Sequence, residues 1–366
     1  MTRTLLPAIL PALYLSGLMA ADWALPRGNS QSTGVGTAKL PDQLNERWVF
    51  KCKDSVEGAP AIVNGVVFVA STDKHLYAVE LATGKEKWKV KLGPMRAAPA
   101  VKGNRVLIGD LEGNVYSVDA ATGEKKWTYT SPVGGEIASG CNFHGENILV
   151  AAQGMPVTCL DPAGKKVWDF EIDGGSNGSP TVSGDMVFAS GCDSAFHVID
   201  AKTGKELWNL PINGQAAATS ATADDVAYVG TVTNDVLAID LKTRKVSWTF
   251  TPATKAQAFY ASAAVTDSLV VTGSRDKKVY ALDRKSGEMK WSFITEGMVD
   301  PSPVVIGERV YVGCLSVPGE FFVLDLNNGA KVQQLTLDSA VTGSVGVGPD
   351  CILVGTEKGS VYCLGK

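Results

Sequence analysis

Few side chains in this 366-residue sequence have the types and spacing of a catalytic centre. The three histidines are His75, His144 and His197, and none stands at metal-ligand spacing from another histidine or a cysteine. No G-x-S-x-G segment marks a serine hydrolase. The glycine-rich segment GGSNG at residues 174–178 precedes an expected strand and not a helix, so it does not predict a phosphate-binding loop. The sequence therefore favours a binding protein over an enzyme, with no catalytic and no metal-ligating residue.

Side chains suited to holding a partner are the better candidates. Segments 93–99, 251–262 and 295–303 differ in length and composition and carry the arginine, methionine and aromatic side chains that anchor interfaces. Alignment of the repeats described below adds one position per repeat, just before an expected strand: Glu57, Arg96, Ala138, Asn177, Ala217, Tyr260, Asp300 and Thr342. The predicted binding residues are Glu57, Met95, Arg96, Asn177, Phe259, Tyr260, Met298, Asp300 and Thr342. A solvated rim, polar because water fills it, is the alternative for the aligned positions, since a pocket needs convergent groups.

A repeat of about 40 residues must position these side chains. Its clearest copies are YAVELATGKEKW (77–88), YSVDAATGEKKW (116–127), HVIDAKTGKELW (197–208) and YALDRKSGEMKW (280–291). Its tryptophans are Trp48, Trp88, Trp127, Trp168, Trp208, Trp248 and Trp291, at a spacing close to 40 residues. That period fits four short antiparallel strands, A to D, which make one blade of a β-propeller. The repeat aspartate is expected to accept hydrogen bonds from turn amides, at Asp119, Asp200, Asp240, Asp283 and Asp325. Thr-Gly supplies the reversal, and the tryptophan offers an apolar surface to the neighbouring blade.

The two ends of the sequence predict how the ring closes. The last repeat stops at residues 360–366, before any fourth strand, whereas ERWVFK at residues 46–51 is a fourth strand with no blade in front of it. Trp48 lies 40 residues before Trp88 and is in phase with the repeat. We therefore predict an all-β, eight-bladed β-propeller of four-stranded antiparallel blades, closed by the N-terminal strand, which removes an exposed sheet edge. Gln333 replaces the tryptophan of the seventh blade, so we expect the least apolar interface there.

Strand direction divides the loops between two faces of the propeller. The D-to-A and B-to-C loops, which vary, emerge on one face, and the short uniform A-to-B and C-to-D turns emerge on the other. Variable loops on a rigid scaffold usually carry the binding function. We therefore expect binding on the face of the D-to-A and B-to-C loops.

The N-terminus predicts export. Residues 1–21 read as a signal peptide, with Arg3, an apolar run and the small residues Ala20 and Ala21, and the run is too short to span a membrane. Residues 22–45 are expected to form an extended arm over the propeller or to be mobile, with Trp23 and Leu25 as anchors, and the propeller spans 46–366. We expect a periplasmic or secreted monomer with no transmembrane segment. The net charge of −4 and the absence of a basic cluster argue against nucleic-acid binding.

The seven cysteines show no C-x-x-C and no adjacent pair. Cys159 and Cys363 align with small residues of the other repeats, such as Ala78 and Ser117, at a buried strand position. Buried free thiols are the favoured interpretation, and a disulfide stays open as the alternative.

The A-x-D-x-x-T-G-x-x-x-W unit resembles the tryptophan-docking repeat of the propellers related to pyrroloquinoline quinone (PQQ) enzymes, over residues 46–366. This superfamily includes PQQ-dependent alcohol dehydrogenases and the outer-membrane assembly lipoproteins of the BamB type. The dehydrogenases are longer, carry adjacent cysteines and bind calcium through carboxylates and amides, none of which this sequence matches. The BamB-like branch matches in length, blade number and export, although no lipidation cysteine follows the apolar run.

The resemblance implies a noncatalytic scaffold that binds a protein partner in the cell envelope, in envelope or outer-membrane protein assembly, and needs no cofactor. Two alternatives stay open. One is a dehydrogenase-like quinoprotein with PQQ and calcium, and the other is a propeller that senses a small ligand or sugar.

Overall fold

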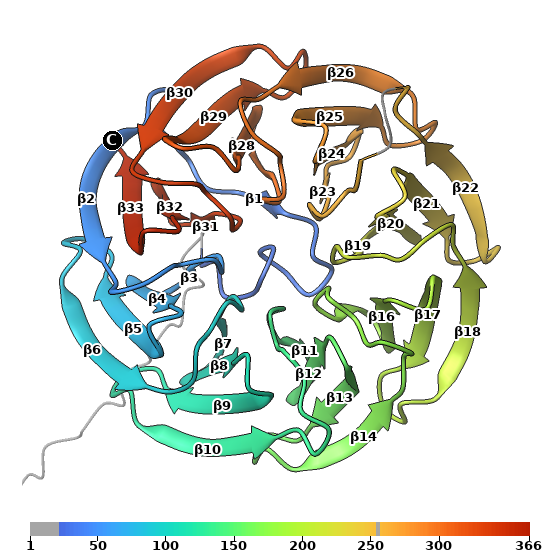
Figure 1. Ribbon diagram of the computed structural model, residues 1–366, viewed down its shortest axis with the longest axis horizontal. Coiled ribbons are helices and arrows are strands. Elements are labelled where there is room, and N and C mark those ends of the chain that lie inside the picture. Colours follow the sequence, from blue (N-terminus) through green and yellow to red (C-terminus); the bar gives the residue numbers. More distant parts are fainter. Residues whose placement is uncertain (1–21, 254–256) are drawn as a thin grey trace, which may run out of the picture.

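Eight β-sheets stand around a central channel in the computed structural model, which describes residues 22–253 and 257–366 (Figure 1). The predicted all-β, eight-bladed propeller is confirmed. The expected signal peptide, residues 1–21, lies outside the described residues. Within the described ranges, no helix is long and apolar enough to cross a membrane.

The first four blades follow one another along the chain. Blade 1 contains β3 (Ala61–Val63), β4 (Val66–Ala70), β5 (His75–Glu80) and β6 (Glu86–Lys91). Blade 2 contains β7 (Ala100–Lys102), β8 (Arg105–Gly109), β9 (Asn114–Asp119) and β10 (Lys125–Thr130). Blade 3 contains β11 (Asn142–His144), β12 (Asn147–Ala152), β13 (Met155–Leu160) and β14 (Lys166–Phe170). Blade 4 contains β15 (Thr181–Ser183), β16 (Met186–Ser190), β17 (Ala195–Asp200) and β18 (Glu206–Pro211).

The second half repeats this order and ends on a composite blade. Blade 5 contains β19 (Ala221–Ala223), β20 (Val226–Gly230), β21 (Val236–Asp240) and β22 (Lys245–Phe250). Blade 6 contains β23 (Ala264–Val265), β24 (Leu269–Ser274), β25 (Lys278–Asp283) and β26 (Met289–Ile294). Blade 7 contains β27 (Val304–Ile306), β28 (Arg309–Gly313), β29 (Gly319–Asp325) and β30 (Lys331–Leu337). Blade 8 contains β31 (Gly346–Val347), β32 (Cys351–Gly355), β33 (Ser360–Gly365) and the N-terminal β2 (Asn45–Lys51).

The ring closes through β2, as the phase of Trp48 predicts. β2 pairs antiparallel with β33 from Asn45 opposite Gly365 to Lys51 opposite Ser360. Figure 1 shows the blue β2 strand on the outside of the red β33 strand, so β2 and the last strand of the chain lie in one sheet.

Each tryptophan of the repeat docks on the C-to-D turn of the next blade. A Cβ atom added to Gly204 of blade 4 would lie only 2.6 Å from the indole of Trp168 of blade 3. The Trp168 Nε1 also donates a hydrogen bond to the carbonyl oxygen of Ala201, at 3.1 Å. The turn glycine therefore both adopts a positive φ of 71° and leaves room for an indole ring. In blade 5 Arg244 replaces the glycine, and its guanidinium lies 5.7 Å from the Trp208 ring centroid.

In blade 7 Gln333 stands at the tryptophan position and docks on the next blade through hydrogen bonds. Its side-chain oxygen accepts the Leu44 amide at 2.9 Å, and its side-chain nitrogen donates to the Leu44 carbonyl at 2.7 Å. Leu44 itself is 2 % exposed. The seventh interface thus replaces an indole by a two-bond amide contact with the residue preceding β2.

The N-terminal arm, residues 22–44, crosses the channel in contact with the blades. Its backbone hydrogen-bonds to the innermost strands of six blades, at Ile62, Val101, Val182, Thr222, Val265 and Val305. Its β1 strand (Val35–Gly36) adds to blade 7 in parallel with β27. Trp23 is 4 % exposed and anchors the arm between blades 1 and 8. Figure 1 shows this blue segment crossing the centre of the ring, where it forms the base of the candidate site.

The seven cysteines are free thiols, and all but Cys192 are buried. Burial raises the pKa of Cys141 and of Cys159 to about 12. The interpretation of these residues as buried small hydrophobes is therefore correct for six of the seven.

Candidate functional site

The eight aligned positions converge on one cavity at the axis of the propeller. Each lies in the D-to-A loop just before the innermost strand of its blade, and together they line a funnel of about 200 Å³. They are Glu57, Arg96, Ala138, Asn177, Ala217, Tyr260, Asp300 and Thr342. Pro26 and Arg27 of the N-terminal arm also line it. The funnel therefore opens on the face of the D-to-A and B-to-C loops and is closed below by the arm.

Six of the nine predicted binding residues belong to this lining, and three do not. Met95 and Phe259 are completely buried, Met95 in the core of blades 1 and 2 and Phe259 in that of blades 5 and 6. Their assignment as surface anchors is corrected, because apolar side chains next to the rim turn inward and fill the space between blades. Met298 is 42 % exposed but stands away from the funnel lining.

The carboxylates of the rim are paired with arginines. Arg96 Nε lies 3.1 Å from Glu57 Oε2. On the opposite side of the funnel, Arg275 forms a bidentate ion pair with Asp300. Its Nε and Nη2 each lie within 3.0 Å of a carboxylate oxygen. The Asp300 hydrogen bond raises the pKa of Arg275. The rim thus carries two locally neutralised ion pairs.

Arg275 also places Tyr260. Its guanidinium carbon stands 4.0 Å from the centre of the Tyr260 ring, a cation–π contact. With the ion pair to Asp300, Arg275 thus joins three loops. Sequence reasoning missed Arg275, because it lies in a B-to-C loop and the alignment followed only the D-to-A positions. The contact fixes the orientation of Tyr260, the one aromatic of the aligned set.

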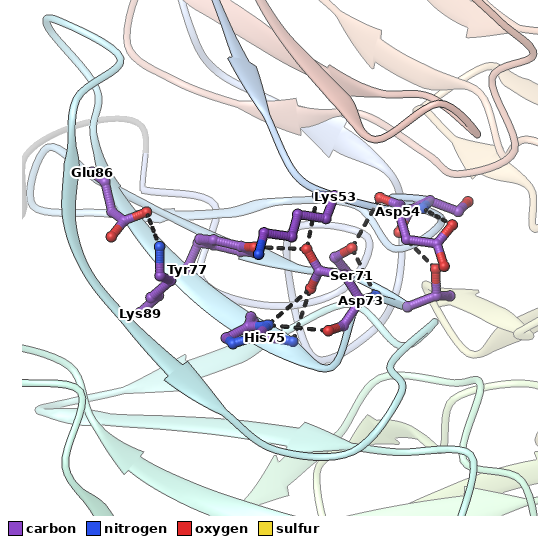
Figure 2. Close-up of polar contacts among 10 residues, drawn as sticks. Lys53, Asp54, Ser71, Asp73, His75, Tyr77, Glu86 and Lys89 are labelled. Atoms are coloured by element: carbon purple, nitrogen blue, oxygen red, sulfur yellow. Dashed lines mark hydrogen bonds and ion pairs between the residues drawn. The ribbon is translucent and has the colours of Figure 1, made fainter.

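A second missed feature holds the B-to-C loops in place. Figure 2 shows Asp73 accepting hydrogen bonds from the Tyr77 hydroxyl at 2.6 Å and from the backbone amides of Lys53 and His75, each at 2.9 Å. Burial alone would raise the pKa of Asp73, but these hydrogen bonds give a net lowering. Because Lys53 follows β2, Asp73 ties the loop of blade 1 to blade 8.

Other blades repeat this contact between a loop aspartate and strand C. Tyr116 donates to Asp110 at 2.7 Å, and Tyr280 donates to Asp276. In blade 4 His197 takes the tyrosine position and contacts Asp193 through Nε2 and Glu206 through Nδ1, each at 2.7 Å. His197 is 7 % exposed, as expected for a packed strand histidine. An aspartate four residues before an aromatic strand residue, or six residues before it in blade 2, was the available sequence signal.

The funnel lining is a poor match for a quinone held over calcium. Calcium takes six to eight oxygen ligands, as a rule with several carboxylates among them. The two carboxylates of this lining are each paired with an arginine, and Arg27 adds a further positive charge at the base. Across the described part of the chain, no group of three or more His, Cys, Asp or Glu side chains has the geometry to hold a metal ion.

Fold and repeat together define the class: the chain is an eight-bladed β-propeller of the PQQ-like type. The family model described as outer membrane protein assembly factor BamB matches residues 40–139 and 115–250, more than half of the chain. The chain belongs to this family. No curated protein sequence matches it significantly.

Solved structures share the fold at low sequence identity. BamB from Moraxella catarrhalis aligns with a TM-score of 0.76 and 18 % identity, over 88 % of this chain and 98 % of that one. The quinohemoprotein alcohol dehydrogenase ADHIIG from Pseudomonas putida HK5 aligns with a TM-score of 0.81 and 13 % identity, over 94 % of this chain and 80 % of that one. A europium-containing methanol dehydrogenase aligns with a TM-score of 0.77 and 13 % identity, over 95 % and 98 % of the two chains. These similarities define the fold and leave the activity to the residues of the site.

Proposed function

We propose that this protein is a noncatalytic scaffold of the cell envelope, monomeric and exported, that binds a protein partner in outer-membrane protein assembly. The observation that carries the proposal is the family match over residues 40–250. The partner contacts the face of the D-to-A and B-to-C loops, where six predicted binding residues gather around the funnel.

The chemistry of this face supports binding. Arg96 and Tyr260 are arginine and aromatic side chains on a rigid ring, the kinds that dominate binding energies at interfaces. Arg96 is exposed, and its side chain retains 49 % of its accessible surface beside Glu57. Tyr260 is held by Arg275 and would lose little conformational freedom on binding.

Replacing Arg96 and Tyr260 together by alanine should weaken partner capture at least about tenfold, as expected for loss of two interface anchors. The measurement is quantitative mass spectrometry of proteins cross-linked to the tagged chain in envelope extracts. Cells that depend on this variant should also contain less folded outer-membrane β-barrel protein, measured by heat-modifiable gel mobility.

The matched control is the double replacement of Lys85 and Lys205 by alanine. Both lysines are exposed on C-to-D turns of the opposite face. This variant should capture the partner as the parent does, and both variants should melt at the parental temperature. Loss of the partner in the turn variant with retention in the rim variant would refute the assignment of the face.

The same proposal predicts that the chain works without a quinone. Purified protein mixed with PQQ and calcium should give the sum of the separate absorbance spectra, because both rim carboxylates are engaged by arginines. A shifted quinone band that saturates at one equivalent, together with alcohol-dependent dye reduction, would establish the dehydrogenase alternative and displace the scaffold proposal.

A further inference from the structure

Arg27 is a buried arginine at the base of the funnel. It is 5 % exposed and is supplied by the N-terminal arm, not by a blade. Its Nη1 donates to Ser344 Oγ at 3.1 Å, and its Nη2 donates to the carbonyl of Ala263 at 3.0 Å. A Cβ on Gly34 would lie 2.0 Å from Arg27 Nη2, so the arm itself leaves space for this side chain.

The positive charge of Arg27 has no counter-charge among the residues that the structure describes. Among residues 22–253 and 257–366, no carboxylate lies at ion-pair distance from its guanidinium, and its Nε has no hydrogen-bond partner. Burial lowers its pKa to about 9, which still leaves it charged at neutral pH. An unpaired buried charge is costly. A negatively charged ligand in the funnel would remove that cost.

Four hydroxyl groups of the same lining have protons to donate. Ser179, Thr219, Ser262 and Ser302 each accept a backbone N–H from the preceding blade, at 2.9–3.0 Å. Each hydroxyl then keeps its own O–H, which reaches no acceptor in the described part of the chain. The inter-blade hydrogen bonds therefore hold an arc of hydroxyl donors around the funnel near Arg27.

We propose that the base of the funnel binds a carboxylate, through the charge of Arg27 and the hydroxyl donors of Ser179, Thr219, Ser262 and Ser302. One carboxylate matches the single uncompensated positive charge, whereas a phosphate dianion exceeds it. The cavity of about 200 Å³ is below the roughly 300 Å³ of drug-sized pockets, so it suits a small organic acid or the terminal carboxylate of a peptide. The site does not depend on the protein partner proposed above.

Calorimetric titration of the purified chain in low-chloride buffer tests this site. The probes are acetate, succinate, inorganic phosphate, and one short peptide prepared with a free and with an amidated C-terminus. We expect saturable binding of a carboxylate and weaker binding of phosphate. Arg27→Gln should weaken carboxylate binding about tenfold or more, as for loss of a hydrogen bond to a charged group, and Arg27→Lys should retain part of the affinity. Arg105→Gln, on an exposed ion pair with Glu146, is the matched control and should bind as the parent does.

The outcomes separate the two sources of the carboxylate. Binding of acetate or succinate supports a free acid, and binding only of the peptide with the free C-terminus supports a chain end. If Arg27→Gln does not fold, Thr219→Val, which removes one hydroxyl donor, should weaken binding several-fold. Absence of carboxylate binding at millimolar concentration, tighter phosphate binding, or full affinity in the Arg27 or Thr219 variants would overturn the proposal. Each result is independent of the partner-capture assay.

Discussion

Deleting residues 45–51 is expected to abolish the folded ring. The deletion removes β2 and with it the whole ladder to β33, whose six residues are all buried. It also removes the docking of Trp48, whose Nε1 donates to the Leu81 carbonyl at 2.9 Å, and the ion pair of Lys51 with Asp338 at 2.7 Å. Each backbone hydrogen bond of the ladder contributes about 1 kcal/mol to the stability. The deletion should therefore cost more than about 5 kcal/mol in total, before the loss of the indole contact is counted. Domains are stable by only about 5–15 kcal/mol.

Thermal unfolding followed by circular dichroism would measure this effect. The truncated chain should show no cooperative transition, and its exposed β33 edge should promote association. Adding a synthetic peptide of residues 40–53 should restore a transition, because a strand supplied in trans can pair with the open edge. An unchanged melting temperature after the deletion would disprove closure through β2.

Replacing Gly204 by alanine should destabilise the protein by about 2–4 kcal/mol. The new methyl group would meet the Trp168 indole at 2.6 Å, and the residue has a φ of +71°, which costs non-glycine residues about 1–2 kcal/mol. Trp168→Ala should cost about 3–5 kcal/mol, because this indole is 8 % exposed. Urea denaturation of the two single variants would measure both losses in the free energy of unfolding.

The double variant and a matched glycine separate strain from docking. With Trp168 removed, Gly204→Ala should cost only its backbone strain. The double variant should therefore be destabilised by less than the sum of the two single variants. Gly184 in the same blade has a φ of +58° and no atom within 4 Å of an added Cβ, so Gly184→Ala should cost only the strain of about 1–2 kcal/mol. Equal costs at Gly204 and Gly184 would show that the glycine serves the turn alone.

The blades and their closure follow from the sequence because they rest on local patterns. A repeat that needs four strands to bury its apolar residues predicts one blade, and the phase of Trp48 with Trp88 predicts which end completes the ring. The same alignment identified eight positions that do meet at the funnel, because blades of the same architecture place equivalent residues at similar distances from the axis. Local turn chemistry also predicted the C-to-D turns, most of which carry an aspartate and a glycine.

The direction of individual loop side chains was decided by tertiary structure. Met95 and Arg96 are neighbours in sequence, yet Met95 is buried between blades while Arg96 is exposed on the rim. No repeat predicts where the arm of residues 22–44 runs, since it has a single copy and its backbone bonds reach six blades. Arg27 meets Ser344 only because the ring is closed, over a separation of 317 residues. The periodicity of the sequence determines the number of blades and how the ring closes. The position of the Arg27 charge at the centre of the ring depends on long-range packing that no local pattern encodes.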